Sequence, residues 1–151
     1  MEVKINTVEE TKKFAENLAK CLKGKEVILL KGNLAAGKTT FVRFLVSSLD
    51  PSLEDEVNSP TFTVMNQYET EKFPIFHIDL YRVKDFDFTD FLGEGVIIIE
   101  WAEDDLFETL EDIPVIFIKI KTLNDQERIF NIKYKNADYI TDCIKAFLKK
   151  I

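Results

Sequence analysis

Residues 32–39 limit the possible folds of this chain more than any other segment. They read GNLAAGKT and match the pattern GxxxxGK[ST]. The apolar stretch 27–30 before them predicts a buried strand, and the amphipathic stretch after them predicts a helix over residues 38–49. In a strand–loop–helix unit of this kind, backbone N–H groups and the positive end of the helix surround phosphate groups. The segment therefore predicts a P-loop that binds a nucleoside triphosphate, expected to be ATP, together with Mg²⁺.

The predicted phosphate site comprises this loop and the first turn of the helix. Lys38 is expected to reach the β- and γ-phosphates, the Thr39 hydroxyl to ligate Mg²⁺, and Thr40 to add a hydroxyl near the α-phosphate. The loop residues expected to contact the nucleotide are Gly32, Asn33, Leu34, Ala35, Ala36 and Gly37. The alternative is a glycine-rich turn that precedes a helix by chance, and the correctly placed strand and helix argue against it.

Two carboxylates stand at the ends of apolar stretches downstream of the loop. Asp79 ends the stretch FHID, and Glu100 ends the stretch VIIIE. An acid at the carboxyl end of a buried strand lies where ligands bind in open α/β sheets. Either carboxylate can hold a water of Mg²⁺, and Glu100 can instead position the attacking water. The alternative is that each one faces solvent at the end of its strand.

Two further residues lie beside these carboxylates in the sequence. His77 is the only histidine of the chain and alternates with Asp79 on one strand face. We expect a half-buried, hydrogen-bonded histidine there rather than a catalytic base. Trp101 directly follows Glu100, and both core packing and a stacking or partner-facing role remain open for it.

The remaining pattern predicts one α/β domain over residues 1–151. It has a P-loop NTPase-like three-layer fold, with a mixed, partly parallel central sheet and antiparallel hairpin additions. A capping box at residues 7–10 predicts a first helix that Gly24 ends. Further strands are predicted at 61–68, 73–80, 96–99, 115–121 and 128–134, an exposed acidic loop at 51–58, and a closing helix at 137–148.

Charge and cysteine usage exclude some classes of protein. The net charge is −7 and the basic residues are scattered among acids, which argues against a broad surface for nucleic acid. Cys21 and Cys143 lie far apart in the chain without a metal-binding spacing, so we expect two reduced thiols. No stretch is apolar enough for a membrane span or an export signal. These observations predict a soluble cytoplasmic protein.

Four segments that occur in a fixed order resemble the TsaE (YjeE) family, the ATPase component of bacterial tRNA threonylcarbamoyladenosine synthesis. They read GNLAAGKTTFVR, NSPTFT, HIDLYR and IEW. The resemblance extends over residues 25–103, and the last three segments together are far more specific than a P-loop alone. It implies a Mg²⁺-dependent ATPase that is weak alone. Its partners would be the threonylcarbamoyl transferase TsaD and the companion protein TsaB, and tRNA would be reached only through that complex.

The resemblance also implies roles for individual residues. The nucleotide would be held by the loop together with Lys38, Thr39 and Thr40, and Thr61 would be a switch-like threonine near the γ-phosphate. Residues that would serve the metal are Thr39, Asp79 and Glu100, those that would serve hydrolysis are Lys38, Thr61, Asp79 and Glu100, and Trp101 would border the site.

The chain departs from the family pattern in three places. Asn33 and Ala35 stand where Asp and Gly are common, and the segment between Arg82 and Val96 is shorter and lacks a Glu/Leu-rich helix.

A P-loop also occurs in proteins with three other functions. A small GTPase needs an [NT]KxD motif that is missing. A small P-loop kinase usually clamps the transferred phosphate with several arginines, whereas this chain has only Arg43, Arg82 and Arg128. A nucleotide-dependent binding module with little turnover remains open.

Overall fold

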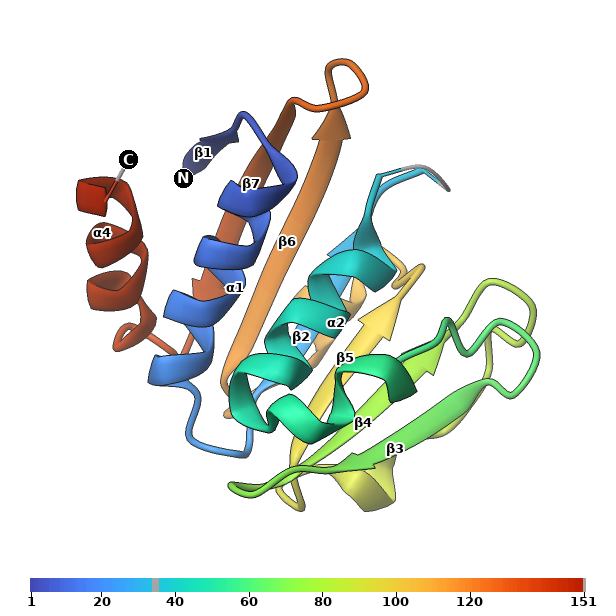
Figure 1. Cartoon of the computed structure of the whole chain (residues 1–151). Helices are drawn as coiled ribbons and strands as arrows, with labels where there is room; N and C mark the ends of the chain where they lie inside the picture. Colours follow the sequence, from blue (N-terminus) through green and yellow to red (C-terminus); the bar gives the residue numbers. More distant parts are fainter. Residues whose placement is uncertain (34–35, 151) are drawn as a thin grey trace.

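A computed structural model describes residues 1–33 and 36–150, and a seven-stranded sheet with the order β1-β7-β6-β2-β5-β4-β3 forms its centre (Figure 1). The strands are β1 (Glu2–Ile5), β2 (Val27–Lys31), β3 (Met65–Glu69), β4 (Pro74–Asp79), β5 (Val96–Glu100), β6 (Val115–Thr122) and β7 (Arg128–Lys135). The helices are α1 (Val8–Cys21), α2 (Lys38–Leu49), α3 (Leu106–Thr109) and α4 (Ile140–Lys150), with 3₁₀ helices η1 (Pro51–Glu56) and η2 (Thr89–Phe91).

The middle of the sheet is parallel and its edges are antiparallel. Strands β6, β2, β5 and β4 run parallel to their neighbours in this group. The hairpin partners β3 and β7, and the edge strand β1, run antiparallel to theirs. This arrangement confirms the predicted mixed sheet with hairpin additions. It also brings the carboxyl ends of β2, β4 and β5 to one edge of the sheet, where ligands bind in such folds.

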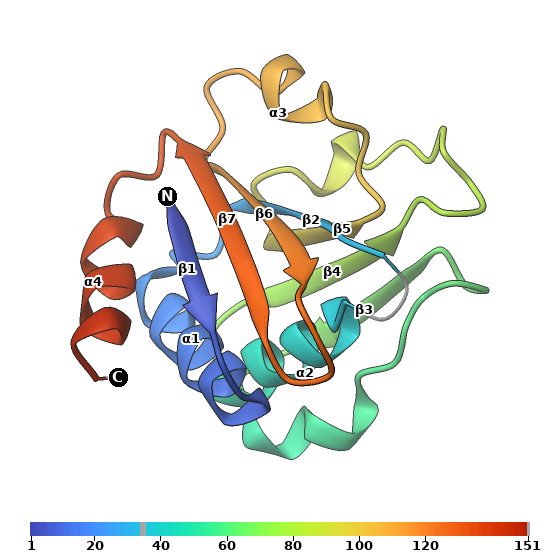
Figure 2. The same cartoon turned by 90° about the horizontal axis from the view of Figure 1, so that it is seen from above.

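The two faces of the sheet are covered differently. Helices α1, α2 and α4 lie on one face, and α3 lies on the other (Figure 2). On the helical face the core contains a cluster of phenylalanine rings, in which Phe14 contacts Phe130 and Phe147 edge-on at centroid distances of 5.3 and 5.4 Å. On the other face, short apolar segments around η2 and α3 cover the central strands.

Local sequence signals account for the starts of helices α1 and α2. The Thr7 Oγ1 atom accepts a hydrogen bond from the Glu10 N–H at 3.1 Å, and the Glu10 side chain accepts one from the Asn6 N–H at 2.7 Å. The first helix therefore begins at the predicted cap. Helix α2 has the predicted bounds and begins directly after Gly37, whose φ is 94°.

The short helices η2 and α3 were not predicted, and three further segments also differ from the sequence predictions. Strand β1 was not predicted, because its four residues gain their place only by pairing with β7. Residues 51–56 form a 3₁₀ helix rather than a loop, since the Asp50 carboxylate accepts a hydrogen bond from the Ser52 N–H at 3.2 Å and caps it. Residues 61–64 form a turn and β3 begins only at Met65, because the Val64 N–H donates to the Pro60 carbonyl at 2.7 Å.

The prediction of two reduced cysteines is wrong. Cys21, at the end of α1, and Cys143, in α4, form a disulfide with a Cα–Cα distance of 6.2 Å. Their separation of 122 residues in sequence suggested independent thiols. Helices α1 and α4 pack side by side, however, and this packing brings the two sulfur atoms together.

Among the described residues, no helix is both long and apolar enough to cross a membrane.

Candidate nucleotide-binding site

The predicted phosphate loop borders a hollow of about 390 Å³ at the carboxyl ends of β2 and β5. Three parts of the chain form it: the start of α2, the segment 58–64, and the end of β5. The lining residues are Gly37, Lys38, Thr39, Thr40, Ser59, Thr61, Glu100 and Trp101. Seven of these eight, all except Ser59, were expected from the sequence for this site, and Gly37 to Thr40 belong to the loop and the first helical turn.

Two glycines give the loop its path. A Cβ atom at Gly32 would lie 2.8 Å from the Ala36 Cβ and 3.0 Å from the Ile120 carbonyl oxygen, so a larger residue does not fit there. Gly37 adopts the left-handed conformation that directs the chain into α2, and glycine takes up this conformation without strain. The expected contacts of Leu34 and Ala35 lie outside the described residues.

Lys38 is a buried cation held at the mouth of the loop. Its Nζ atom donates hydrogen bonds to the Gly32 carbonyl at 2.5 Å and to the Asn33 carbonyl at 3.3 Å. Burial lowers the pKa of the Lys38 ammonium, and the negative charges of Glu100 and Asp79 oppose this effect. Lys38 therefore lies where phosphate oxygens could replace the two carbonyl groups.

Glu100 ends β5 and lies beside the first helical turn. Its Oε2 atom accepts a hydrogen bond from the Thr39 hydroxyl at 3.4 Å, and its carboxylate is almost completely buried. Within residues 1–33 and 36–150, no cluster of three or more His, Cys, Asp or Glu could hold a metal ion on its own. Mg²⁺ in nucleotide sites is usually held by one or two protein oxygens together with phosphates and water. The oxygen atoms of Thr39 and Glu100 fit this kind of site.

Asp79 lies behind the rim of the hollow. Its Oδ2 atom accepts a hydrogen bond from the Thr61 hydroxyl at 2.9 Å, and its Oδ1 atom accepts one from the Tyr81 N–H at 2.8 Å. Asp79 is not among the residues that line the hollow, whereas Thr61 is. Asp79 thus contacts the hollow through Thr61, and no pattern in the sequence indicated this contact.

Trp101 covers the ammonium of Lys38. The residue lies in the left-handed region, with φ at 62°, which is uncommon for a large side chain. Its ring lies 4.8 Å from the Tyr81 ring. Of the two roles left open for Trp101, core packing fits this geometry less well than a stacking or partner-facing role, because the residue lines the hollow and is only partly buried. The geometry also agrees with the place at the border of the site that the resemblance implies.

His77 is fully buried rather than half-buried, and it is hydrogen-bonded as expected. Its Nε2 atom lies 2.5 Å from Glu100 Oε2. In the pairing of β4 with β5, Asp79 lies opposite Glu100, so His77 is the diagonal neighbour of Glu100 on the same face. This contact could have been inferred from the sequence only if the register between β4 and β5 had been known.

Arg128 supports the loop from outside the predicted site. Its Nε atom donates to the Ala36 carbonyl at 3.2 Å, while its Nη1 atom donates to the Asn124 carbonyl at 2.6 Å. Strand β7 therefore fixes one end of the phosphate loop. No sequence signal pointed to this contact, since Arg128 lies 92 residues from Ala36.

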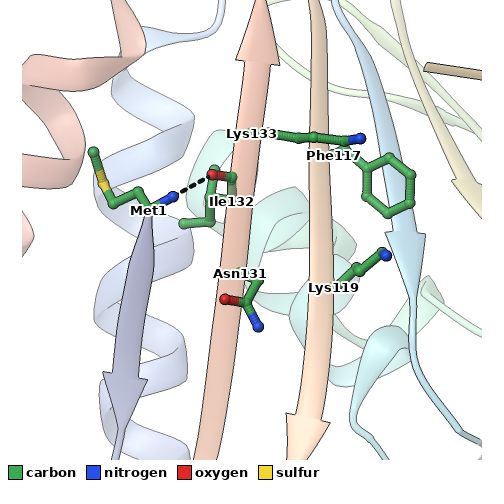
Figure 3. A pocket seen from close by; sticks show the side chains of 6 residues that line it. All are labelled: Met1, Phe117, Lys119, Asn131, Ile132 and Lys133. Atoms are coloured by element: carbon green, nitrogen blue, oxygen red, sulfur yellow. Dashed lines mark hydrogen bonds between the residues drawn. The ribbon is translucent and has the colours of Figure 1, made fainter. Parts of the chain in front are cut away.

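A second hollow, of about 380 Å³, lies on the sheet over β6 and β7 (Figure 3). It is lined by Met1, Phe117, Lys119, Asn131, Ile132 and Lys133. Lys119 and Lys133 project to either side of the Phe117 ring, with Nζ atoms 5.6 and 5.2 Å from its centroid. Lys119 and Lys133, which belong to different strands, therefore lie close together on one face of the sheet.

Comparison with known proteins identifies the family. A family model described as "Threonylcarbamoyl adenosine biosynthesis protein TsaE" matches residues 5–130. This chain belongs to the TsaE family. The predicted resemblance is thereby confirmed, and the match to TsaE extends beyond the four segments that first indicated it.

Individual TsaE proteins are similar to this chain over most of their length. A relative from Aquifex aeolicus is 53% identical over 104 residues, which cover 69% of this chain and 78% of that protein. A relative from Bacillus subtilis is 39% identical over 128 residues, which cover 80% and 77%. Both are named "tRNA threonylcarbamoyladenosine biosynthesis protein TsaE". The crystal structure of Bacillus subtilis YdiB matches with a TM-score of 0.69 and 26% identity, over 99% of this chain and 95% of that one.

Proposed function

We propose that this chain is the ATP-binding and ATP-hydrolysing component of tRNA threonylcarbamoyladenosine biosynthesis, acting on the transferase TsaD and its companion TsaB. One observation carries the proposal: Lys38, Thr39 and Glu100 line one hollow at the N-terminus of α2. In a TsaE-family chain, this combination of a cation, a hydroxyl and a carboxylate fits a Mg²⁺-nucleotide. The 151 residues would act as one P-loop ATPase domain.

Each lining residue has a definite task in this proposal. Lys38 would exchange its bonds to the loop carbonyls for bonds to the β- and γ-phosphates. The Thr39 hydroxyl and the Glu100 carboxylate would hold Mg²⁺, which when bound neutralises phosphate charge. Glu100 would also orient the attacking water. Thr61, held by Asp79 at the rim, would place its hydroxyl near the γ-phosphate.

The arginines explain why the isolated chain would be a weak ATPase. Arg43 donates to the Val57 carbonyl at 3.2 Å, Arg128 is engaged with the loop backbone, and Arg82 lies 4.5 Å from the centroid of the Phe62 ring. None of the three is among the lining residues of the hollow. An arginine placed on the transferring phosphate can be worth roughly 10³–10⁵ in rate. A partner protein would therefore complete the site, and the same shortage of arginines disfavours a small kinase.

The proposed cytoplasmic location rests on the tRNA modification pathway and not on the state of the two cysteines. Modification of tRNA supports a cytoplasmic location, while the disulfide removes the argument from reduced thiols. We propose that tRNA reaches this chain only through the complex, since the net charge of −7 gives little overall attraction to phosphates.

Turnover measurements test the proposal. ATP hydrolysis is measured for the isolated chain and after addition of TsaD and TsaB, and formation of the modified nucleoside is measured on tRNA in the same mixtures. We expect slow hydrolysis alone, faster hydrolysis in the mixture, and modification that needs this chain. ATP binding with no turnover in any mixture would instead favour the nucleotide-dependent binding module, and no ATP binding would refute the proposal.

A further inference from the structure

The only histidine of the chain is buried against the carboxylate that lines the nucleotide hollow. His77 lies in β4 with no exposed surface, and its Nε2 atom is 2.5 Å from Glu100 Oε2. Glu100 itself is 2% exposed. A buried carboxylate is costly unless it is hydrogen-bonded, so the imidazole stabilises the position of Glu100.

The two oxygens of Glu100 are in different situations. Within the described part of the chain, both hydrogen bonds of this carboxylate, from His77 and from Thr39, use Oε2. Glu100 also lines the hollow. Oε1 is therefore the oxygen that remains for a ligand, and the bond from His77 determines which oxygen this is.

The other imidazole nitrogen connects to a different part of the site. His77 Nδ1 lies 3.4 Å from the Tyr68 hydroxyl, which in turn lies 3.3 Å from the Asn58 carbonyl oxygen. Tyr68 is in β3 and is 5% exposed. Asn58 begins the segment that carries Thr61. Tyr68 thus lies between this segment and the imidazole, and the contacts of His77 with Tyr68 and with Glu100 are buried.

We propose that His77 is a positioning residue for Glu100. Its Nε2–H donates to Oε2 and directs Oε1 into the hollow, and Nδ1 then accepts the single proton of the Tyr68 hydroxyl, which orients the imidazole. The inference rests on the proposed function, because it assigns Glu100 to the nucleotide site. Partners of this kind orient the groups that act on a ligand, and their loss typically lowers activity about 10- to 100-fold.

Nuclear magnetic resonance tests the contact without nucleotide, metal or turnover. Because the chain has one histidine, ¹⁵N-labelled histidine gives one set of imidazole signals. We expect a strongly downfield Nε2–H proton that is protected from exchange, and an upfield shift of this proton in Glu100→Ala. Tyr68→Phe should move the Nδ1 signal, whereas the matched control Tyr134→Phe, which removes a hydroxyl bonded to Thr141, should not. A rapidly exchanging Nε2–H that Glu100→Ala leaves unchanged would overturn the proposal.

Kinetics test the positioning role. His77→Phe removes the donor but keeps a ring, and His77→Gln offers an N–H near the position of Nε2. We expect kcat about 10- to 100-fold lower in His77→Phe, with KM within about twofold, and partial recovery in His77→Gln. Circular dichroism and thermal unfolding establish whether each variant is folded. If a variant does not fold, the exchange protection of the Nε2–H proton in the labelled wild-type protein still tests the contact.

The same measurements separate this inference from the proposed function. If Glu100→Ala loses turnover while His77→Phe retains it, His77 does not position Glu100, and the nucleotide site stands. If His77→Gln loses as much as His77→Phe, the donor is not what matters and the proposal is also wrong. If Glu100→Ala retains full turnover, the assignment of Glu100 fails, and the positioning role fails with it.

Discussion

The ammonium of Lys38 lies 3.6 Å from the centroid of the Trp101 ring, which places a buried cation against the face of an indole. Trp101 holds this position in an uncommon left-handed conformation, and such conformations often mark functional sites. The ring closes one side of the hollow over the residue that is expected to bind phosphate. A nucleotide entering the hollow would therefore meet Lys38 and Trp101 together.

We expect Lys38→Ala to abolish measurable ATP turnover and to weaken ATP binding, because no other cation lines the hollow among the residues that the structure describes. Isothermal calorimetry measures the affinity, and phosphate release measures the turnover. Lys145→Ala, which removes an exposed lysine of α4, is the matched control and should change neither. Unchanged affinity and turnover in Lys38→Ala would show that the nucleotide binds elsewhere.

The two acids should separate in their effects. Glu100→Ala should reduce hydrolysis more than binding, since Glu100 lines the hollow beside Thr39. Asp79→Ala should act mainly through the Mg²⁺ dependence of ATP binding, because Asp79 is expected to hold a water of Mg²⁺ in addition to the Thr61 hydroxyl at the rim. ATP affinity is measured with and without Mg²⁺ for both variants, and Asp125→Ala, in the exposed β6–β7 turn, serves as the control. Equal effects of both variants on every quantity would contradict these separate roles.

The parts of the fold that local patterns determine could be predicted. Helix α2 and strand β5 follow from residue spacing and from the glycine before the helix, and both have nearly the predicted bounds. The turn at residues 61–64 could not be predicted. Its β-branched and aromatic residues favour a strand, but Val64 adopts a left-handed φ of 69° in a turn that the Pro60 carbonyl closes.

Contacts within the site can likewise be divided into those that a short segment determines and those that depend on distant segments. The loop and the strand-end acids were visible in the sequence, because each depends on a short segment. The bonds from His77 to Glu100, from Thr61 to Asp79 and from Arg128 to Ala36 join segments 18 to 92 residues apart. They depend on strand register and on the path of the turn, which the residue pattern of one segment does not contain. The disulfide between α1 and α4 was missed for the same reason.

Addition of TsaD and TsaB should raise ATP turnover well above that of the isolated chain, and Thr61→Ala or Trp101→Ala should reduce this increase. Thr61 and Trp101 line the hollow from two different segments, and both are only partly buried, so a partner can reach them. Turnover is measured at increasing concentrations of the partner pair. Thr109→Ala, on the opposite face in α3, is the control for Thr61→Ala. Fast hydrolysis by the isolated chain, unaffected by either partner, would contradict this prediction.

Reduction of the disulfide between Cys21 and Cys143 should lower the free energy of unfolding by about 2–4 kcal/mol, because the bond restricts the unfolded chain. Urea denaturation with and without a reductant measures this difference. Cys143→Ser should lower stability by a similar amount and make it insensitive to the reductant. ATP turnover below the unfolding transition should not change, since neither cysteine lines the hollow. Equal stability of the oxidised and reduced proteins would show that the disulfide does not form in solution.

Alkaline pH should weaken the contact between Tyr139 and Glu26. Glu26 is fully buried, and its carboxylate accepts hydrogen bonds from the Tyr139 hydroxyl and from three backbone N–H groups at 2.8 to 3.1 Å. Burial raises the pKa of Tyr139 above its ordinary value of 10.0, and the bond to Glu26 and the charge of Glu26 raise it further. In the unfolded chain the phenol loses its proton near pH 10, whereas in the folded chain it keeps it. The folded state then binds more protons, so stability falls as the pH rises above 10.

Comparison with Tyr139→Phe isolates this effect. Between pH 7 and 9 the variant should be less stable than the wild type by about 1–3 kcal/mol, because a hydrogen bond to a buried carboxylate is lost. This difference should stay constant up to pH 9 and shrink above pH 10, since only the wild type loses the contribution of the neutral phenol. Urea denaturation at steps of half a pH unit measures it. A difference that stays constant through pH 11 would show that the pKa of Tyr139 is not raised in the folded protein.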